Sequence, residues 1–178
     1  MASTSTSKQA MLVDRPLHSF ARIGTSACLS SSTNLNSIVG NGCALIVDCS
    51  GNDGAVVDSM TVIENEANTT ATRICVFIST AVSSSLITNL NTAYVAGITI
   101  NGSGLVGDRT NIPLPPLSVP VPCLASPAAS VSTYPSEVDK KNTGLYVPSG
   151  ALLYVGTSVV LTNPASTQLT VFAQGGFY

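Results

Sequence analysis

Charge is what this sequence lacks most. Only 9% of its 178 residues are Asp, Glu, Lys or Arg, whereas charged residues make up about 25% of a typical soluble domain. Positive charge is especially scarce, because seven Lys and Arg residues are outnumbered by nine Asp and Glu residues. A protein that binds nucleic acid by neutralising phosphates needs a basic surface. The composition therefore argues against nucleic acid as a partner.

Long hydrophobic runs are also missing. The charge-free stretch from residue 74 to residue 107 is interrupted repeatedly by Ser, Thr and Asn, and it falls short of the roughly 18 consecutive apolar residues that a membrane span needs. The opening "MASTSTSKQAMLVDRP" lacks the basic start and the apolar core of a secretory signal. We expect neither a membrane anchor nor export by the secretory route.

Residues for acid–base chemistry are few. His18 is the only histidine, and the chain has no Trp and only five Tyr. A hydrolase needs a base close to a nucleophile, and nothing in the spacing pairs His18 with a cysteine. The scarcity of aromatic residues also weakens a carbohydrate platform of stacked rings. We therefore expect no enzyme, no catalytic residue and no cofactor.

The cysteines follow no metal or disulfide pattern. Their number is odd and no C-x-x-C pair occurs; they are Cys28, Cys43, Cys49, Cys75 and Cys123. In a protein that is not secreted, this predicts buried free thiols rather than a zinc site or a disulfide framework.

Several carboxylates lie close together in the sequence, namely Asp48, Asp53, Asp58, Glu64 and Glu66. The segment "DCSGNDG" superficially looks like an oxygen-rich calcium loop, but it lacks the EF-hand spacing and the final bidentate Glu. We expect a solvated turn and no metal. A calcium-dependent or lectin-like binding module, with the turn from Asp48 to Asp58 as its site, remains an alternative.

What the sequence does contain is a period of two. In the run 55–65, Val57, Thr61 and Ile63 fall on one face, and β-branched residues at this spacing favour a strand. No segment has a helical period. About eight short strands, with a turn roughly every ten residues, predict an all-β antiparallel sandwich of the jelly-roll kind. The runs 55–65 and 72–82 flank a polar turn, and we expect them to pair as a hairpin.

The first twenty residues differ from the rest. Their Ser and Thr repetition predicts an N-terminal arm, residues 1–20, before a sandwich domain of residues 21–178. An apolar group lies inside this polar arm: Met11, Leu12, Val13, Leu17 and Phe20. Such a group seldom stays in water without a partner. It either contacts another protein or caps the sandwich of its own subunit, and the sequence leaves both open.

The order of features from Gly24 onward resembles the small β-sandwich decoration or cement proteins of tailed-bacteriophage capsids. The pieces that carry the resemblance are "GTSACL", "GNDGAVVDSMTVIENEANTTATRICVFI", "IPLPPL", and "VPSGALLYVGTS" followed by "LTVFAQGGFY". The resemblance implies a virion protein on the capsid surface, assembled in the host cytoplasm, with the major capsid protein as its partner. The apolar group of the arm would then contact the capsid. A tail or baseplate component is the alternative within the virion.

The C-terminus is uncharged from Val147 to Tyr178. A bare strand of this kind aggregates unless another strand or subunit covers it. We expect "QLTVFAQGG" to pair inside the sheet, while Phe177 and Tyr178 reach a contact between subunits as aromatic anchors. This predicts a homotrimer, with a dimer as the second choice.

Overall fold

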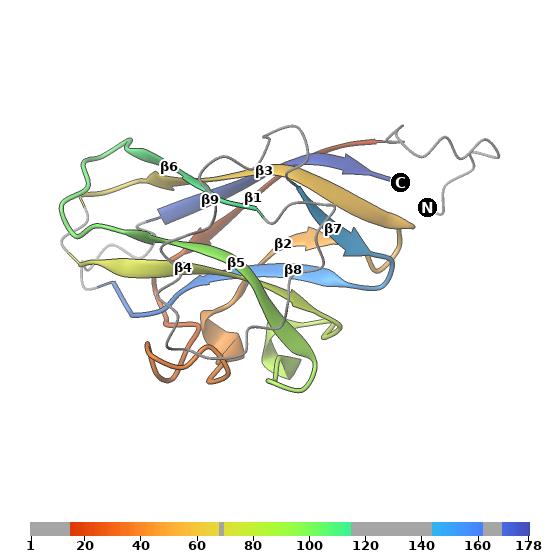
Figure 1. Cartoon of the computed structure of the whole chain (residues 1–178), viewed down its shortest axis with the longest axis horizontal. Helices are drawn as coiled ribbons and strands as arrows, with labels where there is room; N and C mark the ends of the chain where they lie inside the picture. Colours follow the sequence, from red (N-terminus) through yellow and green to blue (C-terminus); the bar gives the residue numbers. More distant parts are fainter. Residues whose placement is uncertain (1–14, 68–69, 115–143, 162–168) are drawn as a thin grey trace.

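The computed structural model describes residues 15–67, 70–114, 144–161 and 169–178. Within them the chain forms nine strands in two antiparallel sheets, and its only helical elements are the 3-10 turns η1 (Gly40–Gly42) and η2 (Ser84–Leu86). The two sheets face each other (Figure 1). The prediction of an all-β antiparallel sandwich is confirmed.

The chain crosses repeatedly between the two sheets. Sheet A contains, in spatial order, β1 (Arg15–Ile23), β9 (Leu169–Phe177), β3 (Gly54–Glu64) and β6 (Arg109–Ile112), with β7 (Leu145–Pro148) also paired to β3. Sheet B contains β2 (Ala44–Asp48), β8 (Leu152–Thr157), β4 (Thr72–Ser79) and β5 (Thr92–Ile100). When β7 is set aside, β1 pairs with β9 and β2 pairs with β8. This order is the jelly-roll arrangement of two interleaved Greek keys.

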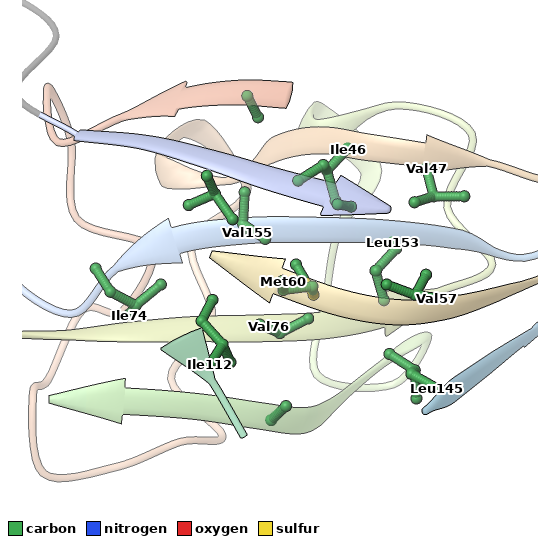
Figure 2. Packing of buried hydrophobic residues seen from close by; sticks show 14 of the residues in the cluster. Ile46, Val47, Val57, Met60, Ile74, Val76, Ile112, Leu145, Leu153 and Val155 are labelled. Atoms are coloured by element: carbon green, nitrogen blue, oxygen red, sulfur yellow. The ribbon is translucent and has the colours of Figure 1, made fainter. Parts of the chain in front are cut away.

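The core lies between the sheets and is made of aliphatic side chains. Figure 2 shows Val57 and Met60 of sheet A packed near Val76, Leu153 and Val155 of sheet B. Each of these five side chains is at most 1% exposed. Alternating residues of each strand supply this layer, as the period of two requires.

The predicted hairpin of residues 55–65 and 72–82 is wrong. β3 lies in sheet A between β9 and the pair β6 and β7, whereas β4 lies in sheet B between β5 and β8. The turn between them therefore crosses from one layer to the other. The segment 27–39 also reads as a strand in the sequence, but it forms none, since Ala27, Leu29 and Ile38 take part only in isolated bridges.

The predicted end of the arm falls inside a strand. β1 begins at Arg15 and pairs with β9 along its whole length. Leu17 is 3% exposed and belongs to the core, so burial of this side chain holds residues 15–20 in the sheet. Within the described residues the sandwich begins at residue 15, and residues 1–14 lie outside the described part.

The C-terminal strand is a central strand. β9 pairs with β1 on one side and with β3 on the other, which confirms for residues 169–176 that "QLTVFAQGG" pairs inside the sheet. Leu169, Val171 and Ala173 point into the core. Because its own subunit occupies both edges, β9 needs no second subunit to cover it. The lack of charge in this strand follows from its central place.

Candidate functional site

The outer face of sheet A carries an exposed aromatic pair. Phe20 of β1 lies opposite Phe172 of β9, and the ring centroids are 5.9 Å apart. Leu17 and Ala21 of β1 point into the core, so the alternation of the strand turns Phe20 outward. Phe20 is 61% exposed and Phe172 39%. Two neighbouring aromatic rings on an open face are typical of a surface that binds another protein.

The neighbours of this pair on the same face are small and mostly uncharged. In the same cross-strand row, the Thr61 hydroxyl donates to Asn111 Oδ1 at 3.0 Å. In the next row, the Ser59 hydroxyl donates to Gln174 Oε1 at 3.4 Å. Groups of this kind lose little free energy when a partner excludes water from them, compared with ionised side chains. We call Phe20, Phe172, Thr61, Ser59 and Gln174 the open face.

Two arginines flank the open face. Arg22 and Arg109 are exposed, and they lie in the row that joins Thr170 to Ile63. A partner with a carboxylate at this rim would gain a charge-assisted hydrogen bond.

The two C-terminal residues expected at a subunit contact have partners in their own chain. The Phe177 ring lies under the guanidinium of Arg15, 4.7 Å from the ring centroid. Tyr178 donates its backbone N–H to the carbonyl of Gly54 at 3.0 Å, and its ring packs against Tyr146 at 6.4 Å between centroids. Both residues remain only half-buried. These contacts hold the terminus in place without a second subunit.

The outer face of sheet B is covered. Residues 24–43 and 80–91, here called the loop layer, lie on the side of sheet B that faces away from sheet A (Figure 1). They bury a second hydrophobic cluster around Phe77 and Tyr154, each at most 1% exposed. The Tyr154 hydroxyl donates to the carbonyl of Ala81 at 2.9 Å and so fixes the layer to the sheet.

The loop layer has exposed apolar residues of its own. Val82, Leu86 and Leu90 are 72%, 55% and 93% exposed. They are isolated aliphatic side chains on short turns, whereas Phe20 and Phe172 are neighbouring rings on a rigid sheet. Aromatic anchors on a rigid element bind with a smaller loss of conformational entropy.

The apolar group predicted to bind a capsid is divided by the fold. Leu17 caps the core of its own subunit, which is the second of the two alternatives. Phe20 faces solvent. Met11, Leu12 and Val13 lie outside the described residues. Phe172 completes the surface and was not predicted. The alternation of "LTVFAQ" carried the signal, because it places Phe172 and Val171 on opposite faces of the strand.

His18 and the cysteines are far apart in the fold. His18 is exposed on the outer face of sheet A, in the row of Gln174. Cys28, Cys43 and Cys75 lie between sheet B and the loop layer, and Cys49 lies in the core between the sheets. All four are buried and free, as predicted, and Cys123 lies outside the described residues. The structure does not bring His18 to any of these four described thiols.

The five carboxylates do not form a ligand set. Asp48 accepts the backbone N–H of Ser50 at 2.8 Å in a local turn. Asp58 lies within β3, and Glu64 is the last residue of this strand. An extended strand of 11 residues places its two ends roughly 30 Å apart. In the part of the chain that the structure describes, no group of three or more His, Cys, Asp or Glu residues is arranged to hold a metal ion.

Glu64 is unusual because its carboxyl is buried. The residue is 5% exposed, and Oε2 has no hydrogen-bond partner within the described ranges. Burial, and secondly the charge of Asp108, raises the pKa of Glu64 above its usual value. The carboxyl lies against Gly104, where a Cβ atom would overlap it.

Comparison with known proteins gives no relative for this chain. No family model, no curated protein and no solved structure matches it. Among residues 15–67, 70–114, 144–161 and 169–178, no helix is long and apolar enough to cross a membrane. The function must be argued from the fold and its surfaces.

Proposed function

We propose that this protein is a structural virion protein, which binds the outside of an assembled phage capsid and bridges neighbouring major capsid subunits. The observation that carries the proposal is the open face. Phe20 and Phe172 are exposed side by side on a rigid sheet, among neutral polar groups that are easily desolvated. This surface suits lasting contact with another protein.

The fold supports the same proposal by analogy. Jelly rolls recur in viral capsid and lectin domains and in cupins, although a fold alone does not determine a function. The low charge is consistent with a protein that is covered by neighbours in use. Because such a protein binds only the assembled shell, its binding adds a free-energy term that opposes rupture of the shell.

A homo-oligomer belongs to the proposal, with a trimer as first choice and a dimer as second. Several copies acting together would strengthen attachment even where each contact is weak. The central position of β9 removes one reason for an oligomer, since no bare C-terminal edge needs covering. The remaining reason is the partial exposure of Phe177, Tyr178 and Tyr146 at the end of sheet A.

The test is to incubate the purified protein with capsids that lack it and to image the particles by electron microscopy. We expect added density for the wild type and none for the double variant Phe20→Ser and Phe172→Ser. Leu90→Ser is the matched control, because Leu90 is 93% exposed in the loop layer. Absence of density with saturating wild-type protein would refute the capsid proposal. Loss of density for Leu90→Ser alone would place the contact on the loop layer.

A tail or baseplate component would use the same open face. Labelled antibody against the protein separates the two, since label on the tail rather than the head of intact particles would favour the tail assignment.

A further inference from the structure

Three cysteine thiols meet beneath the loop layer. Cys75 lies on β4 and points away from the sandwich core, Cys28 lies in the loop layer, and Cys43 immediately precedes β2. The three side chains belong to one buried cluster, and hydrogen bonding with Cys43 and Cys75 raises the pKa of Cys28. Cys28 and Cys75 are fully buried, and Cys43 is 7% exposed. Cys43 is therefore the outermost of the three.

Two glycines allow the chain to pack closely around Cys28. Gly156 of β8 lies opposite Cys75, and a Cβ atom there would approach Cys28 Cβ to 2.5 Å and Cys28 Sγ to 3.0 Å. At Gly42, a Cβ atom would overlap the backbone of Ala27 and Cys28. The side chain of Cys28 thus occupies space that any larger residue at position 156 would fill.

Backbone hydrogen bonds hold the two loop cysteines on this spot. Cys28 donates its N–H to the carbonyl of Thr157 at 2.8 Å and accepts the N–H of Val39 at 2.8 Å. Cys43 donates its N–H to the carbonyl of Gly40 at 2.9 Å. These bonds fix the backbone positions from which the two side chains enter the cluster.

The fourth described cysteine shows that burial alone does not produce this cluster. Cys49 is as buried as Cys28, but it packs among aliphatic side chains between the sheets. A solitary buried cysteine behaves as a small hydrophobic residue. Three cysteines gathered in one cluster are instead placed for thiol–disulfide exchange. As noted above, the described residues offer no arrangement for a metal.

We propose that Cys28 and Cys43 are a redox pair, which closes to a disulfide when a low-molecular-weight disulfide is present. The Cys43 thiolate attacks one sulfur of the oxidant, forms a mixed disulfide and releases one small thiol. The Cys28 sulfur then attacks Cys43 Sγ, forms the internal disulfide and releases the second small thiol. The two protons lost by the protein end on the two small thiols, and the oxidant is reduced by two electrons.

The order of these steps follows from exposure and hydrogen bonding. The hydrogen bonds with Cys43 and Cys75, and then burial, raise the pKa of Cys28 above its usual value, so Cys28 is a poor first nucleophile. Cys43 is the most exposed of the three cysteines, at 7% against 0% for Cys28 and Cys75, so an oxidant reaches it first. Cys75 is fixed in a strand that is paired on both edges.

The experiment treats the native full-length protein with excess oxidised glutathione, blocks the remaining thiols with an alkylating agent in denaturant, and maps the peptides by mass spectrometry. We expect a mass loss of two hydrogen atoms and one cross-linked peptide that joins Cys28 to Cys43, with three of the five thiols alkylated. The midpoint of denaturant unfolding should rise, because the bond closes a loop of the unfolded chain.

Two variants sharpen the result. Cys43→Ser should abolish the internal disulfide, and Cys49→Ser should leave it unchanged, since Cys49 lies on the other side of sheet B. Five alkylated thiols after treatment of the wild type would overturn the proposal without any variant. A peptide that joins Cys28 to Cys75, or a cross-link that requires Cys49, would overturn the assignment of the pair.

Discussion

The two sheets of this jelly roll differ in what covers them. Sheet B is a middle layer, with the sandwich core on one side and the loop layer on the other (Figure 1). All six residues of β8 are accordingly buried. In sheet A, β1 alternates between buried and more exposed residues from Pro16 to Ile23, and no described segment covers its outer face.

This difference gives the same residue type two roles. Phe77 of sheet B and Phe172 of sheet A both point away from the sandwich core. Phe77 is fully buried by the chain's own loops, whereas Phe172 is 39% exposed. An aromatic residue that the chain covers contributes to folding. One that it leaves open is available to a partner, and this is the physical basis of the proposed capsid contact.

The largest expected effect comes from Phe77→Ala. Removal of this ring leaves a cavity under the loop layer, and we expect a loss of about 3–5 kcal/mol in the free energy of unfolding. Phe172→Ala should cost about 1 kcal/mol, because the ring is 39% exposed and its removal leaves no enclosed cavity. Denaturation followed by circular dichroism measures both. Equal losses would show that the open face is covered within the chain.

Gly156→Ala tests how closely the loop layer approaches sheet B. The new Cβ atom would lie 2.5 Å from both Cys28 Cβ and the carbonyl oxygen of Gly42, and such overpacking costs about 1–3 kcal/mol. Gly51→Ala is the control, because no other atom lies within 4 Å of a Cβ there. Denaturation followed by circular dichroism measures the free energy of unfolding of both variants. A neutral Gly156→Ala would mean that the loop layer moves away from the sheet without loss.

Tyr154→Phe removes one hydrogen bond between the same two layers. The carbonyl of buried Ala81 would lose the hydroxyl that donates to it, at a cost of about 1 kcal/mol in the free energy of unfolding. Tyr146→Phe on the exposed surface is the matched control. A cost no larger than that of the control would show that water replaces the hydroxyl.

The alternation of residues 55–65 predicted a strand but not which of its side chains reach the core. It placed Val57 on the face of Thr61 and Ile63, and this is wrong, because a bulge between Val57 and Ser59 turns Val57 into the core with Met60 and Val62. The pairing of β3 was not predictable, since alternation identifies a face but not a neighbour. Contacts between strands distant in sequence decided it, as the pairing of β1 with β9 shows.

The loop layer could not be predicted for a related reason. Residues 27–39 alternate like a strand, but their Ser and Asn side chains bond to the local backbone. Ser37 Oγ donates to the carbonyl of Asn34 at 2.6 Å, and Asn36 donates its N–H to Asn34 Oδ1 at 2.9 Å. Such local bonds compete with a sheet ladder. The cysteine cluster was not predictable either. Cys43 and Cys75 are 32 positions apart in the sequence, and they come together only when the loop layer folds onto sheet B.

The smallest expected effect concerns the rim of sheet A and depends on pH. The pKa of Glu64 is raised in the folded protein by burial and by Asp108, so between the usual and the raised pKa the folded state holds a proton that the unfolded state releases. Stability therefore falls as the pH rises through this interval. Glu64→Gln should flatten that part of the profile of unfolding midpoint against pH, and Asp108→Asn should flatten it less, because Asp108 is the second cause. A profile for Glu64→Gln that keeps the wild-type slope would show that another group titrates there.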